Sequence, residues 1–160
     1  MKTGTVTIPD DHAYILVLGD LHVGDKAFGK ESRNKLYNYL TWVEENKNAR
    51  IILNGDLLNT ATRTSKTSPF EQDMTLEEQV NTVARLLEPV KDRIIGAVMG
   101  NHERRIADFS GYDPTLSVLS LLQLPVADIY FKNCGVLKIK VGKRNRGQGK
   151  EGTGVAYTIV

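Results

Sequence analysis

The sequence predicts an α/β fold built on a mostly parallel β-sheet, because three short apolar runs alternate with segments of helical periodicity. Each run is bounded by turn residues, which is typical of a fully buried strand. The three runs are Tyr14–Leu18, Ile51–Leu53 and Ile94–Met99. A strand, helix, strand, helix, strand order is the signature of parallel strands joined by crossover helices.

Two helices are expected between these strands. The first covers 32–46, and the apolar residues that recur on one face of it are Leu36, Tyr39, Leu40 and Val43. The second begins at a capping box, with Thr75 as N-cap and Glu78 three residues later. Its predicted buried stripe consists of Leu76, Val80, Val83 and Leu87.

The last third of the chain predicts a short helix and then a β-hairpin. Asp113-Pro114 is typical of an N-cap followed by the first helical residue. From Val136 to Val141 apolar residues and lysines alternate, which places Leu137, Ile139 and Val141 on one face of a strand. A Gly-rich connection over 142–154 leads to a second strand over 155–160. No domain boundary is apparent, so residues 1–160 are expected to form a single domain.

Composition indicates an ordinary globular protein. The 160 residues are 41% hydrophobic and 25% charged, with a net charge of +2 that is too small to argue for nucleic acid by itself. The single cysteine excludes an internal disulfide. No segment approaches the roughly 20 apolar residues of a membrane span, and no signal peptide is apparent. We therefore expect a soluble, cytoplasmic protein without a membrane partner.

Polar residues of metal-binding type follow each of the three apolar runs. Asp20 and His22 come after the first run, Asp56 after the second, and Asn101 and His102 after the third. Ligands of open α/β sheets lie outside the carboxyl ends of the strands, so we expect these side chains at one sheet edge. Carboxylate, amide and imidazole donors without a thiolate suit Mn, Fe, Zn or Mg.

Each of these motifs also has an ordinary interpretation when it is taken alone. An aspartate after a glycine at a strand end is often a turn or N-cap residue, and Gly-Asn is a common turn dipeptide. Glu103 is either a residue that orients a metal ligand or a solvated helix-start residue. Arg104 and Arg105 either contact a phosphate or are surface charges. The occurrence of all three blocks in order, each behind a β run, favours the metal site.

Asp20-Leu21-His22, Gly55-Asp56 and Gly100-Asn101-His102-Glu103 resemble the first three signature blocks of the calcineurin-like metallophosphoesterases. In that family two metal ions bridged by one aspartate activate a water that attacks a phosphate ester. The resemblance implies that Asp20 and His22 hold the first metal, that Asp56 bridges both, and that Asn101 holds the second. His102 would be the catalytic histidine beside the phosphate, and the substrate would be a phosphomonoester or a phosphodiester, including a nucleotide or nucleic acid.

The chain departs from the family in its histidines. The family continues with further ligand histidines, whereas this chain has His12, His22 and His102, and His12 precedes the first predicted strand. We therefore expect a partial calcineurin-like fold that corresponds to the N-terminal portion of the domain. The alternative to a phosphoesterase is an inactive metal- or phosphate-binding fragment, or half of a split enzyme. Such a fragment would self-associate or pair with a complementary C-terminal fragment.

Overall fold

The computed structural model describes residues 1–61 and 72–142, together with the backbone of residues 154–159. Twelve elements are named in these ranges. They are, in chain order, β1 (Lys2–Ile8), β2 (Tyr14–Leu18), α1 (Lys30–Glu45), β3 (Ala49–Asn54), α2 (Leu76–Leu87), the 3₁₀ helix η2 (Glu88–Arg93), β4 (Ile94–Val98), α3 (Asn101–Ser110), α4 (Pro114–Leu121), α5 (Val126–Ile129), β5 (Gly135–Val141) and β6 (Gly154–Ile159).

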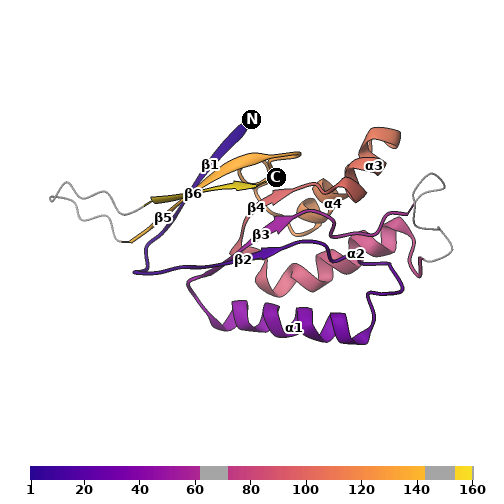
Figure 1. Ribbon diagram of the computed structural model, residues 1–160, viewed down its shortest axis with the longest axis horizontal. Coiled ribbons are helices and arrows are strands. Elements are labelled where there is room, and N and C mark those ends of the chain that lie inside the picture. The colour runs from indigo at the N-terminus through magenta and orange to yellow at the C-terminus, as the bar shows by residue number, and fades with distance from the viewer. Residues whose placement is uncertain (62–71, 143–153, 160) are drawn as a thin grey trace.

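The strands form two sheets (Figure 1). In the first, β2, β3 and β4 lie side by side in that order and are all parallel, with α1 and α2 as the crossover connections. In the second, β5 is central, parallel to β1 and antiparallel to β6. The predicted parallel β-α-β-α-β core and the hairpin that follows it are therefore confirmed.

The parallel sheet has one face on helices and the other on the second sheet, and β3 shows why. Ile51 and Leu53 of β3 belong to the core under α1 and α2. Ile52 points the other way, into a second core with residues of β1, β4 and β5. Successive side chains of a strand alternate between faces, so a strand covered on both faces needs a continuous apolar run.

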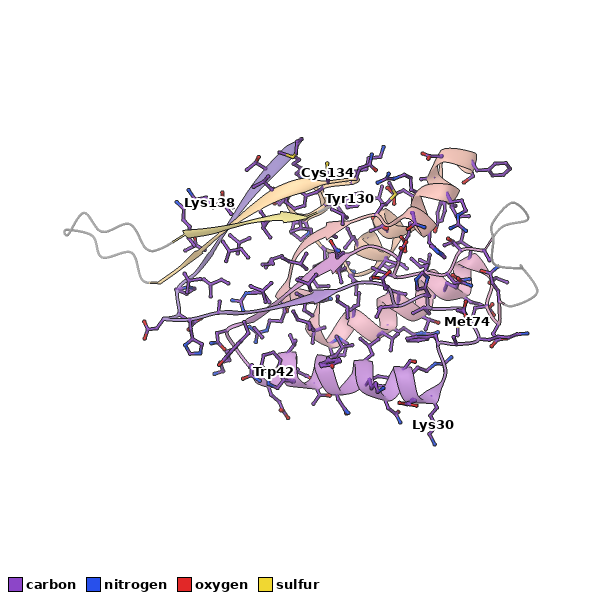
Figure 2. All side chains as sticks on the ribbon, in the orientation of Figure 1. Lys30, Trp42, Met74, Tyr130, Cys134 and Lys138 are labelled. Atoms are coloured by element: carbon purple, nitrogen blue, oxygen red, sulfur yellow. The ribbon has the colours of Figure 1, made fainter. Side chains whose placement is uncertain are left out.

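Strand β5 faces that second core with every other residue. Leu137 and Ile139 are each 1% exposed, whereas Lys140 and Lys138, the latter labelled in Figure 2, are exposed to solvent. The alternation in the sequence thus predicted the orientation of this strand correctly. Its apolar face is buried against the parallel sheet that the first half of the chain supplies.

Four elements were not predicted from the sequence: strand β1, helix α3 and the short elements η2 and α5. Strand β1 is rich in threonine and glycine, and it is paired with β5, whose residues lie more than a hundred positions away. Its alternation of Val6 and Ile8 with Thr5 and Thr7 was the available signal. Helix α3 was missed because Gly100-Asn101 is typical of a turn, while here Gly100 is the N-cap of a ten-residue helix.

None of the helices in the described part of the chain is long and apolar enough to cross a membrane. The 16-residue α1 buries Leu36, Leu40 and Val43, as expected, whereas Tyr39, which the periodicity placed on the same face, is exposed to solvent.

The packing of β5 gives a first prediction. Ile139→Ala should lower the free energy of unfolding by about 2–5 kcal/mol, because it opens a cavity between the two sheets. Lys138→Ala changes the neighbouring residue on the solvent face of the same strand. It should alter the free energy of unfolding by less than about 0.5 kcal/mol. Urea unfolding of both variants measures this, and equal losses would show that β5 does not pack as described.

Candidate metal centre

Three loops meet at the carboxyl edge of the parallel sheet and bring Asp20, His22 and Asp56 together. One potential ligand atom from each lies within 4.8 Å of the others. His22 Nε2 is 3.8 Å from an Asp20 carboxylate oxygen, and the Asp20 side chain is 87% exposed. Two carboxylates and an imidazole at these separations form a donor set that can hold a divalent cation and leave it accessible from solvent.

His102 lies beside this cluster. Its backbone N–H donates to Asp56 Oδ1 over 2.8 Å, and its ring centroid is 4.4 Å from that of His22. Asn101 precedes it as the exposed first residue of α3. The beginning of α3 is thereby fixed to the aspartate that follows β3, so the second and third sequence blocks meet in space.

The backbone at the cluster is held in an unfavourable conformation. Asp20, His22 and Asp56 have φ angles of 52°, 49° and 48°, in the left-handed region that side-chain-bearing residues rarely adopt. Bonds between loops maintain these angles: Asp20 N–H donates to the Gly55 carbonyl over 3.2 Å, and His22 N–H to the Asp56 carbonyl over 3.1 Å. Strain of this kind persists only where the surroundings enforce it.

Two glycines explain why the second and third loops can approach so closely. A Cβ on Gly55 would lie 2.4 Å from the Gly100 nitrogen, and one on Gly100 would lie 2.2 Å from the Asp56 nitrogen. Neither position has room for a side chain. The glycines in the Gly-Asp and Gly-Asn-His blocks therefore set the distance between the loops.

Glu103 is the buried residue that joins these loops. Its side chain is fully buried, and its carboxylate accepts hydrogen bonds from the backbone N–H groups of Asp56 (3.0 Å), Leu58 (2.9 Å) and Gly100 (3.0 Å). Burial raises the pKa of this carboxyl above its ordinary value, and the backbone donors act in the opposite direction. Of the two interpretations the sequence left open, the structure supports the one in which Glu103 orients a candidate ligand, here Asp56.

The His102 ring is held from its other side by the loop after β3. Its Nδ1 contacts the carbonyl of Asn59, and because a carbonyl only accepts, Nδ1 carries the proton. The Thr60 hydroxyl donates to the His102 carbonyl over 2.6 Å, which attaches the same loop to α3 a second time.

A buried glutamine on α2 supports that loop. Gln79 is fully buried, its side-chain oxygen accepts from the Thr60 N–H, and its nitrogen donates to Gln72 and Met74. Sequence reasoning missed Gln79, Thr60 and Asn59. The signal for Gln79 was its place on the apolar face of α2, since a polar residue in a buried stripe requires partners.

The remaining candidates lie outside the cluster. Arg104 is exposed and Arg105 half-buried on α3. Among the described residues, no hydrogen bond or salt bridge joins either guanidinium to the cluster. His12 packs edge-on against Tyr14, the first residue of β2. It therefore lies toward the amino ends of the strands, opposite the cluster.

The comparisons with known proteins agree with this geometry. A sequence model of the family "Calcineurin-like phosphoesterase" matches residues 13–148, which is most of the chain. The protein therefore belongs to the calcineurin-like phosphoesterase family, whose members act on phosphoesters. Searches of the curated proteins and of the solved structures give no match.

Glu103 gives the second prediction. In Glu103→Gln the amide nitrogen would face backbone N–H donors, and each unmade buried bond costs about 1–3 kcal/mol. We expect a lower free energy of unfolding in urea. Asp108→Asn, an exposed change on the same helix, should have almost no effect. Equal stability of the two variants would mean that the carboxylate does not hold the loops.

Proposed function

We propose that this protein hydrolyses phosphoesters with the help of divalent metal ions bound at the carboxyl edge of the parallel sheet. The observation that carries the proposal is the meeting of Asp20, His22 and Asp56 within 4.8 Å of one another, beside His102. Membership of a phosphoesterase family supports the reaction class.

The donor chemistry suits two hard or borderline cations. Asp20, His22 and Asp56 would hold the first, while Asp56 and Asn101 would hold the second. Asp56 would be the shared ligand because a carboxylate has two oxygens, whereas Asn101 would offer a neutral carbonyl oxygen. Bound metal ions would lower the pKa of a water and neutralise phosphate charge. Oxygen and imidazole donors are compatible with Mn, Fe, Zn or Mg.

The chain's own residues would position the substrate and move the proton. His102 is the proposed catalytic histidine: in its imidazolium form, with Nδ1–H directed to the Asn59 carbonyl, its Nε2–H would donate to a phosphate oxygen or give its proton to the leaving-group oxygen. Glu103 would position Asp56 through its backbone bond. Arg104 or Arg105 would contact substrate phosphate through the guanidinium, which suits bidentate phosphate binding.

Two chemical classes of substrate suit the proposed site. Phosphomonoesters and phosphodiesters both fit an open, solvent-accessible site, and a nucleotide or nucleic acid is one form of diester.

A second candidate function is a metal- or phosphate-binding module with little or no turnover, completed by another copy or a complementary fragment. It is favoured by the ligand count: the proposed second metal has only Asp56 and Asn101 as ligands, and the third histidine, His12, packs on Tyr14. This candidate predicts metal binding without hydrolysis.

Metal binding is tested by calorimetry with Mn²⁺. Asp56→Asn should weaken binding at least about tenfold, because a shared charged ligand is lost. The amide oxygen can still accept from His102 N–H, so the fold should be retained. Asp92→Asn serves as the matched control, since Asp92 precedes β4 and therefore lies toward the amino ends of the strands, away from the proposed site. Equal Mn²⁺ affinity in both variants would remove Asp56 from the site.

Turnover distinguishes the two candidates. Nitrophenolate release from p-nitrophenyl phosphate and from bis(p-nitrophenyl) phosphate is measured with Mn²⁺. Metal-dependent release that Asp56→Asn abolishes supports the enzyme, and the preferred substrate separates monoesterase from diesterase. Mn²⁺ binding without release of nitrophenolate from either substrate supports the binding module.

A further inference from the structure

We propose that the pocket between the β2–α1 loop and helix α1 binds the organic group of the phosphoester and selects a flat aromatic ring, either an aryl group or a nucleobase. This inference rests on the proposed function, in which the phosphate would bind at metal ions held by Asp20, His22, Asp56 and Asn101. It adds a substrate class and names Tyr39 as a specificity-determining residue.

The position of the pocket connects it to the metal centre. Asp20 and His22 line the pocket and are also members of the donor cluster. From them the pocket extends to α1, where its wall is a single helical stripe formed by Ser32, Lys35, Leu36 and Tyr39. In Figure 2 this part of α1 is the stretch between the labelled Lys30 and Trp42, which both belong to the helix. A phosphate at the donors would therefore have its ester group next to this wall.

The pocket has a polar part, which includes Asp20, His22 and Asp25, and an apolar part. Leu18, Phe28 and Leu36 are buried residues that line it. Its volume of about 520 Å³ lies within the range of small-molecule sites. A ligand with an anionic end and an apolar end matches both parts at once, since the apolar end leaves water as the phosphate meets the metal.

Tyr39 supplies the preference for an aromatic ring. Its side chain lines the pocket but is 57% exposed, so its ring is available to a ligand. The core contacts of α1 are made by Leu36, Leu40 and Val43, not by Tyr39. Aromatic rings pack against each other in offset or edge-to-face geometry, which favours a planar group over an alkyl group.

Three phosphonates that the protein cannot hydrolyse test the proposal, with binding measured by calorimetry in saturating Mn²⁺. They are methylphosphonate, phenylphosphonate and the phosphonate analogue of adenosine monophosphate. Phenylphosphonate should bind about tenfold more tightly than methylphosphonate, because its ring is removed from water. In Tyr39→Ser the preference should fall to about threefold or less. Tyr37→Ser is the matched control: Tyr37 lies on the same helix, is 53% exposed and does not line the pocket.

The outcomes separate this proposal from the one on which it rests. If Tyr39→Ser reduces the preference for phenylphosphonate over methylphosphonate and Tyr37→Ser preserves it, the pocket is supported. The adenosine analogue should then bind more tightly than phenylphosphonate if the natural group is a nucleobase, and less tightly if it is a simple aryl group. Equal binding of methyl- and phenylphosphonate to Mn²⁺-loaded protein, or equal effects of the two tyrosine variants, overturns the pocket and leaves the metal site intact. Absence of Mn²⁺ binding overturns both.

Discussion

The buried carboxylate of Glu103 is the contact on which the site geometry depends. It accepts from the N–H groups of Asp56, Leu58 and Gly100, so one side chain fixes the loop after β3 against the beginning of α3. Those donors come from loop backbone that is not paired in a strand, and an unmade bond there would leave a buried group unsatisfied. Burial of the Glu103 side chain also raises the pKa of its carboxyl above the ordinary value.

The glycines and the strained backbone are parts of the same arrangement. Gly55 and Gly100 allow the two loops to touch, and Glu103 then holds them in contact. Asp20, His22 and Asp56 all have left-handed φ angles, and their ligand atoms lie within 4.8 Å of one another. Rigid positioning of this kind suits ligands of a metal ion, whose geometry tolerates little displacement.

Around this centre the two faces of α1 have different uses. Leu40 and Val43 anchor the helix to the sheet, Ser32, Lys35 and Tyr39 form the wall of the pocket beside Asp20, and Leu36 belongs to both. On the other side of the sheet, the core beneath β5 supports the strands without entering the site. The carboxyl edge of the parallel sheet is thus the meeting point of three loops, and the packed layers lie behind it.

The sequence by itself determined the parallel core, the hairpin, the capping box of α2 and the candidate residues Asp20, His22, Asp56, Asn101 and His102, because these follow from local periodicity and from residues at strand ends. Tertiary structure decided the rest. Strand β1 exists through its pairing with the distant β5. The burial of Glu103, the support from Gln79 and the orientation of His102 depend on partners 19 to 47 residues away. Local patterns carry no information about such partners, since burial and hydrogen bonding are set only when the layers pack.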